Sequence, residues 1–135
     1  MPKPPIVADL RWQRGLVFEA ESSGQTLTID GDTRDGASPT QLLAIALAGC
    51  MAADVAYILA KGRHRVRALR SHIAADRAQT EPHRIVRVAL HFTVEGAVPA
   101  DAVGRAIALS RETYCSVWHS LREDIDFNTT FEVSA

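Results

Sequence analysis

The sequence predicts one domain of the α+β class that covers residues 1–135. Two observations carry this prediction. Short stretches in which apolar and polar residues alternate occur near both ends and in the middle of the chain, and this period of two is typical of strands. A long segment with helical character separates the first strands from the rest. The composition, 47% hydrophobic and 23% charged, is that of an ordinary globular protein.

The first thirty residues read as strands and turns. Leu16, Phe18 and Ala20 alternate with polar neighbours, and a second alternating run surrounds Leu27 and Ile29. The segment 22–24, Ser-Ser-Gly, predicts the turn between these two strands. The residues from Gly31 to Gly36 have the composition of a loop.

A helix is predicted from Pro39 to about Lys61. Ser38 is a suitable N-cap, Pro39 suits the first helical position, and Gln41 completes a capping box. Gly62 is a plausible residue to follow the last turn.

This helix is apolar nearly all the way round, which is typical of a helix that is buried on every side or that spans a membrane. The central Asp54 would cost about 3 kcal/mol in a bilayer, and the amphipathic strands elsewhere need water on one face. We therefore expect a central buried helix and no membrane. One small chain has little sheet with which to cover it, so a dimer is expected.

The second half begins and ends with strands. Residues 66–77 have a mixed pattern, whereas residues 84–95 alternate clearly, and Thr80-Glu81-Pro82-His83 predicts the loop between them. The chain closes with a strand over residues 127–133. Between these strands, helical spacing predicts a helix from Asp101 to about Arg111 and a short one from Ser116 to Arg122.

Several classes of function are disfavoured. The net charge of −1 argues against a nucleic-acid partner. The five histidines have no helical i, i+4 pairing, and His72 and His91, which could face each other across a hairpin, are better explained as surface residues, so no metal site is expected. The N-terminus lacks the apolar run of a signal peptide, which predicts a cytoplasmic protein.

The two cysteines, Cys50 and Cys115, are the remaining candidates for chemistry. Asp54 lies one helical turn after Cys50, and its negative charge would disfavour a thiolate there unless a cation were near. Cys115 precedes the predicted short helix, whose N-terminus would favour its thiolate. Two buried structural cysteines are the alternative interpretation, because free cysteines are commonly buried.

Two segments, each containing one cysteine, resemble a known family. The stretch from Gly36 to Cys50, GASPTQLLAIALAGC, and the stretch from Ala108 to Val117, ALSRETYCSV, resemble the two cysteine motifs of the OsmC/Ohr family, the osmotically induced and organic hydroperoxide resistance proteins. The likeness is to the OsmC-like branch. It implies an intertwined homodimer in which antiparallel sheets pack on a long buried central helix.

The resemblance also implies an activity. Active members of the family reduce organic hydroperoxides, with the cysteine that matches Cys50 attacking and the one that matches Cys115 resolving. They use a dithiol reductant of the dihydrolipoyl type and no metal or flavin, and they protect against oxidative or osmotic stress. Leu43 and Leu47 are expected to supply apolar walls for an alkyl hydroperoxide.

One position departs from the peroxidases of this family. A glutamate follows the helix-starting proline in those proteins and pairs with an arginine, whereas Thr40 stands there in this chain. Neither Arg14 nor Arg34 matches that arginine by position. A non-peroxidatic small-molecule or acyl-binding protein, or a redox sensor, is therefore the alternative function.

Overall fold

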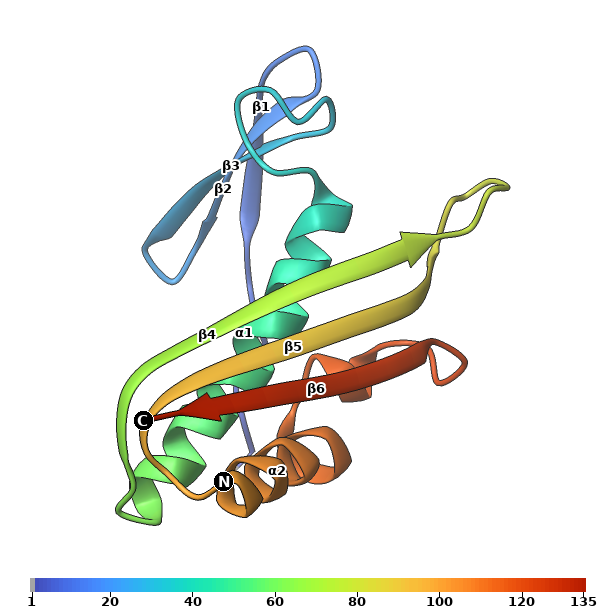
Figure 1. Ribbon diagram of the computed structural model, residues 1–135. Helices are drawn as coiled ribbons and strands as arrows, with labels where there is room; N and C mark the ends of the chain where they lie inside the picture. Colours follow the sequence, from blue (N-terminus) through green and yellow to red (C-terminus); the bar gives the residue numbers. More distant parts are fainter. Residues whose placement is uncertain (1) are drawn as a thin grey trace. The chain divides into compact units, whose positions relative to one another are not determined.

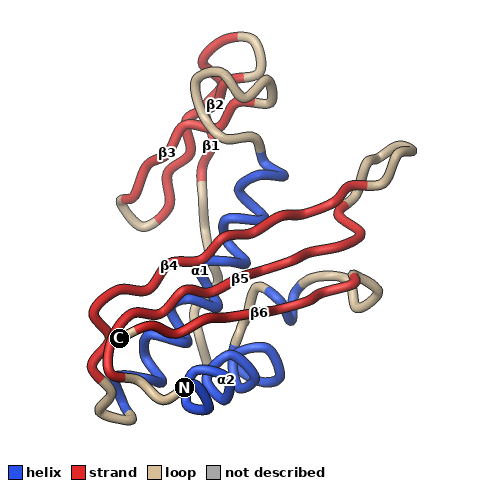
Figure 2. Tube along the Cα trace, viewed as in Figure 1, coloured by secondary structure: helices blue, strands red, loops and turns tan. Residues whose placement is uncertain are grey.

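The computed structural model describes residues 2–135. By its internal contacts the chain divides into two units, one ending at Leu43 and one that begins at Ala44. Each unit contains a three-stranded sheet, and Figures 1 and 2 show the elements of both. The α+β class is confirmed, while the prediction of a single domain stays a prediction.

The first unit is an antiparallel meander in the order β1-β2-β3. Its strands are β1 (Asp9–Arg14), β2 (Val17–Ser22) and β3 (Gln25–Asp30). Ser22 pairs with Gln25, so the connection between β2 and β3 is a two-residue turn. Ser23 and Gly24 have φ values of 49° and 81°, the left-handed conformation that such turns require. The predicted turn at residues 22–24 is therefore confirmed.

Asp30 organises the loop that follows β3. Its side chain is buried, and its carboxylate accepts hydrogen bonds from the backbone N–H groups of Asp35, Asp32 and Arg34. These bonds hold the pKa of Asp30 below its ordinary value, although burial opposes the shift. Arg14 forms an ion pair of 2.7 Å with Asp35. Arg14 and Arg34, the two arginines compared with the arginine of the peroxidases, therefore both lie in this first unit.

Helix α1 (Pro39–Lys61) begins where the sequence predicts. The backbone N–H of Ser38 donates to Gln41 Oε1 at 2.9 Å, and the backbone N–H of Gln41 donates to Ser38 Oγ at 3.2 Å. This is the reciprocal arrangement of a capping box, which satisfies two backbone donors that have no partner inside the helix.

The expected burial of α1 on all sides, which needs the sheets of a dimer, stays a prediction. One face is buried, through Leu47, Met51, Val55 and Leu59. Tyr57, in contrast, is 66% exposed. The helix is long and apolar enough to cross a membrane, a test that the core helix of a soluble protein also passes.

The second unit contains the sheet β4-β5-β6. Its strands are β4 (Arg65–Arg77), β5 (Ile85–Ala97) and β6 (Asp126–Ser134). Strands β4 and β5 form a long antiparallel hairpin in which His72 pairs with His91, as the sequence suggested. His91 is held by Thr130 Oγ1 at 2.7 Å and by Glu132 Oε1 at 3.1 Å, so it has polar partners on the sheet surface.

The expectation of wholly antiparallel sheets is wrong for this second sheet, because β6 runs parallel to β5. The physical reason is the connection between them. The chain leaves β5 through helix α2 (Ala100–Leu109) before it enters β6, and a long crossover of this kind is what a parallel neighbour requires.

The core of the second unit lies between this sheet and the two helices (Figure 1). Strand β5 contributes one alternating face, α1 contributes its buried stripe, and α2 contributes Val103, Ala106 and Ile107. The buried β5 residues are Val88, Leu90, Phe92 and Val94. This confirms the alternation predicted for residues 84–95.

The segment after α2 differs from the sequence prediction. A π-helical turn (Ser110–Tyr114) extends α2, and only a three-residue 3₁₀ turn (Trp118–Ser120) forms where a short α-helix was expected. The backbone N–H of Cys115 donates to the carbonyl of Ser110 at 2.8 Å, a bond that spans five residues. Cys115 therefore does not lie at the N-terminus of an α-helix, and the expected favourable helix dipole is absent.

Candidate functional site

The second unit brings together the two cysteines predicted as site residues. Cys50 lies in the middle of α1, and Cys115 follows the π-helical turn. The two sulfur atoms and a carboxylate oxygen of Asp54 all lie within 4.8 Å of one another. Both cysteines are free thiols. A disulfide has a sulfur–sulfur bond of about 2 Å, so small side-chain movements would be needed to join them.

Hydrogen-bond donors favour the thiolate of Cys50. Partial burial acts to raise the pKa of Cys50, but the backbone N–H of Val117, the thiol of Cys115 and the hydroxyl and N–H of Ser116 together bring it below its ordinary value. The Ser116 hydroxyl lies 3.8 Å from the sulfur. The donors that lower the pKa of Cys50 are neutral, so hydrogen bonds here supply part of the stabilisation that a nearby cation would give a thiolate.

Cys115 has the opposite character. Its side chain is fully buried, and this burial, together with the hydrogen bond and the charge of Cys50, raises the pKa of Cys115 to about 11. The backbone N–H of Trp118 donates to its sulfur at 3.3 Å, which opposes the effect of burial without overcoming it. The expectation that the thiolate of Cys115 is favoured is therefore wrong. The two thiols differ in acidity, with Cys50 the more readily ionised.

Asp54 has a defined partner beside the sulfurs. The hydroxyl of Ser110 donates to Asp54 Oδ2 at 2.8 Å, and Ser110 itself is 0% exposed. Asp54 was singled out in the sequence by its spacing from Cys50, whereas Ser110 was expected only as part of the inward face of its helix. Ser110 lies on the inward face of the helix, seven residues after the buried Val103, and it begins the π-helical turn that the sequence did not reveal.

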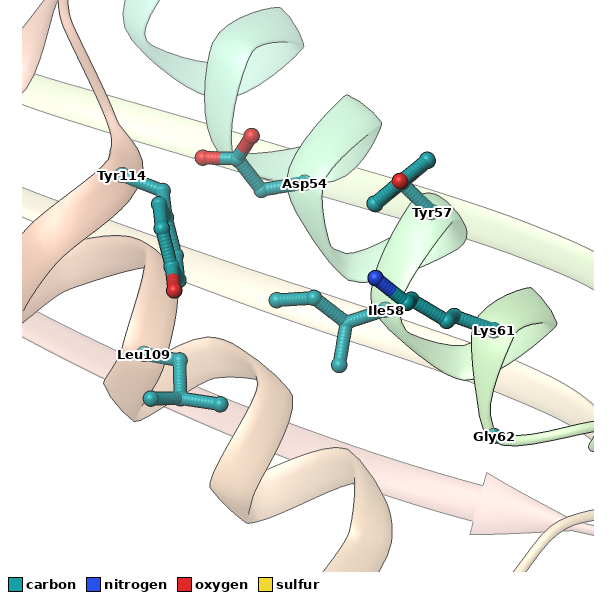
Figure 3. Close-up of a pocket in the computed structure, with 7 residues that line it drawn as sticks. All are labelled: Asp54, Tyr57, Ile58, Lys61, Gly62, Leu109 and Tyr114. Atoms are coloured by element: carbon teal, nitrogen blue, oxygen red, sulfur yellow. The ribbon is translucent and has the colours of Figure 1, made fainter.

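A groove of about 700 Å³ starts at Asp54 and extends along α1 (Figure 3). Tyr57, Ile58 and Lys61 line it from α1, and Leu109 and Tyr114 line it from the end of α2 and the turn that follows. Asp54 thus belongs both to the groove and to the cysteine cluster. Leu47, which the sequence suggested as a wall, lies in the core instead.

The cluster also bears on metal binding. Two sulfurs and one carboxylate are donors that a soft divalent cation accepts, but a closed structural zinc site uses four protein ligands. Among the described residues this cluster offers three. Unequal acidity and mutual hydrogen bonding of the two thiols are features of a redox pair, and the expectation of no metal stays a prediction.

Comparison with known proteins places this geometry in context. The profile of the OsmC-like protein family matches residues 30–130. Protein YhfA from Escherichia coli strain K12 is 38% identical over 131 residues, which are 95% of this chain and 98% of that protein. Its name states no activity.

Solved structures share the fold. A hypothetical protein from Aquifex aeolicus VF5 superposes with a TM-score of 0.90 at 24% identity, covering 97% of each chain. An organic hydroperoxide resistance protein OsmC from Legionella pneumophila superposes with a TM-score of 0.73 at 17% identity, covering 98% of this chain and 100% of the other. The family profile, the relative at 38% identity and the shared fold together show that this chain belongs to the OsmC-like family.

Proposed function

We propose that this protein reduces organic hydroperoxides with its two thiols, Cys50 attacking the peroxide and Cys115 resolving the product. The observation that carries the proposal is the pair of sulfurs within 4.8 Å, one with a lowered and one with a raised pKa. An attacking thiol must ionise near neutral pH, whereas a resolving thiol must stay protonated until its turn comes.

The proposed cycle has three steps. The Cys50 thiolate attacks the distal oxygen of the hydroperoxide, the O–O bond breaks, and the leaving alkoxide takes a proton to become an alcohol. The Cys115 sulfur then attacks the Cys50 sulfenic acid, which forms a disulfide and releases water. A dithiol of the dihydrolipoyl type reduces the disulfide to two thiols and becomes a cyclic disulfide itself.

The groove supports an organic substrate. Its walls carry Tyr57, Ile58, Leu109 and Tyr114, so an alkyl or aryl group is accommodated better than a strongly hydrated one. The cycle depends on reduced thiols, which fits a cytoplasmic protein that acts against oxidative or osmotic stress.

We also propose that the protein is a homodimer. The exposed side of α1 carries large apolar residues, among them Tyr57 at 66% and Ile45 at 55% exposure. A second copy of the same helix is an apolar partner of matching length. Sedimentation analysis at micromolar concentration is expected to give twice the chain mass, and Ile45→Asp is expected to weaken the association.

To test the redox proposal, hydroperoxide consumption by the reduced protein is measured with dihydrolipoamide as the reductant. The wild type is expected to turn over cumene hydroperoxide. Cys50→Ser is expected to abolish turnover, and Cys115→Ser to consume a single equivalent and then stall. A reduced, folded wild type that consumes no hydroperoxide would contradict the proposal.

The alternative is a protein of the same fold that binds a small molecule or an acyl group without reducing peroxides. Thr40 in the place of the peroxidase glutamate and the groove beside Asp54 favour it. In that case a fluorescent fatty acid would bind, the Tyr57→Ala variant would bind it less tightly, and neither cysteine would be needed. A redox sensor would form the disulfide but would show no sustained turnover.

A further inference from the structure

The first observation concerns the position of Asp54 relative to both sulfurs. Asp54 follows Cys50 by one turn of α1, so its carboxylate lies on the same side of the helix. One of its oxygens is within 4.8 Å of the Cys50 sulfur and of the Cys115 sulfur. A carboxylate at this distance reaches either sulfur after a small rotation or through one water molecule.

The second observation is that Asp54 is oriented by a buried group. The Ser110 hydroxyl donates to Oδ2 at 2.8 Å, which leaves Oδ1 without a hydrogen-bond partner among the described residues. Ser110 is 0% exposed and is carried by the π-helical turn that ends at Tyr114, immediately before Cys115. One structural feature therefore positions both the carboxylate and the resolving thiol.

The third observation concerns the chemistry that Cys115 must perform. Burial, the largest cause of the raised pKa of Cys115, remains when Cys50 has become a sulfenic acid, so Cys115 enters the resolving step as a thiol. A neutral thiol attacks a sulfenic acid slowly, because the thiolate is the nucleophile. Efficient resolution therefore requires a base at Cys115, and Asp54 is the carboxylate within reach.

We propose that Asp54, held by Ser110, is the proton-transfer group of the resolving step. The inference rests on the function proposed above. As the bond between the Cys115 and Cys50 sulfurs forms, Asp54 takes the proton from the Cys115 thiol. The S–O bond of the Cys50 sulfenic acid breaks, and Asp54 returns the proton to the departing hydroxide, which leaves as water. The carboxylate ends the step in its starting state.

The groups that face Asp54 come from two elements. From α1 they are Cys50, Tyr57 and Lys61, and from the segment after α2 they are Ser110, Tyr114 and Cys115. The ammonium of Lys61 lies 5.9 Å from the centre of the Tyr57 ring. Lys61 is the one basic side chain among these groups.

The test separates the two chemical steps by single-turnover stopped flow. Reduced protein is mixed with cumene hydroperoxide, sulfenic acid is trapped with dimedone, and disulfide formation is followed by quenching and mass spectrometry. For Asp54→Asn we expect sulfenic acid to accumulate and disulfide formation to slow by about 100-fold or more. Asp76→Asn is the matched control, because Asp76 lies on the exposed face of β4 and pairs with Arg87.

Three readouts distinguish a proton-transfer role from a structural one. The disulfide-forming rate of Asp54→Asn should rise about tenfold per pH unit, since its reaction depends on free thiolate, whereas the wild-type rate should be nearly flat around neutral pH. Asp54→Glu should recover part of the rate. Formate should restore part of the rate to Asp54→Ala, and Ser110→Ala should slow the step less than Asp54→Asn.

The outcomes keep the two proposals apart. If the wild type forms sulfenic acid and Asp54→Asn closes the disulfide at the wild-type rate, the role of Asp54 is refuted while the thiol cycle stands. If Asp54→Asn is slow but keeps the wild-type pH profile, Asp54 is only structural and the inference fails. If the wild type forms no sulfenic acid, both proposals fall.

Discussion

The unequal acidity of the two thiols predicts unequal alkylation. At pH 7.5 a thiol with a pKa of about 11, such as Cys115, is ionised to about 0.03%, whereas an ordinary thiol with a pKa of 9.0 is ionised to about 3%. The pKa of Cys50 lies below that ordinary value. The ionised fractions of the two thiols therefore differ by about 100-fold or more.

Intrinsic reactivity offsets part of this difference. A thiolate of higher pKa is the stronger nucleophile. With a Brønsted slope of about 0.45, a pKa higher by two units makes the rate constant of the Cys115 thiolate roughly 8-fold larger. Ionisation alone thus predicts that Cys50 reacts at least about 10-fold faster. The complete burial of Cys115 adds to this preference, because the reagent must reach its sulfur.

The assay uses iodoacetamide at a series of pH values, with site-resolved mass spectrometry of the reduced protein. The Cys50 rate is expected to level off at a pH below that of a free thiol. In 8 M urea both cysteines should react at similar rates, which serves as the control. Equal rates for the two cysteines in the native protein, or faster labelling of Cys115, would refute the reasoning.

Three further outcomes are expected. Ser116→Ala removes one donor to the Cys50 sulfur and should move its alkylation profile to higher pH, which the same assay measures. Phe92→Ala empties the centre of the core and should lower the free energy of unfolding in urea by about 3–5 kcal/mol. The lowered pKa of Asp30 contributes stability that is present above the unfolded-state pKa and lost as the pH falls through the folded-state pKa. Asp30→Asn should therefore weaken the acid dependence of the melting temperature; an unchanged dependence would contradict this.

Local signals in the sequence were sufficient for most of the secondary structure. The start of α1 was predictable because a capping box acts between residues three positions apart, and both of its hydrogen bonds form. Strand β5 was predictable because one of its faces is buried, so the period of two is plain. The parallel direction of β6 was not predictable, since it depends on the path of the chain through α2.

Local sequence patterns predicted less of the candidate site than of the fold. The motifs identified Cys50 and Cys115, but the helix expected after Cys115 does not form, and its absence removes the predicted preference for a thiolate there. Ser110 lies seven residues after Val103, so helical spacing placed it on the apolar face, but no motif marked it as a site residue. The π-helical turn that begins at Ser110 was not predictable, and its backbone bond from Cys115 to Ser110 helps to place the cysteine.

Sequence alone therefore established most of the elements after residue 16, the helix that carries Cys50 and the residue types available for redox chemistry, but not strand β1. The tertiary structure decided which groups meet and how acidic each thiol is. The physical reason is that hydrogen bonding and burial act at short range in space between residues far apart in the chain. Ser116 and Val117 lower the pKa of Cys50 only because folding brings their donors to its sulfur, and the same packing encloses Cys115 and raises its pKa.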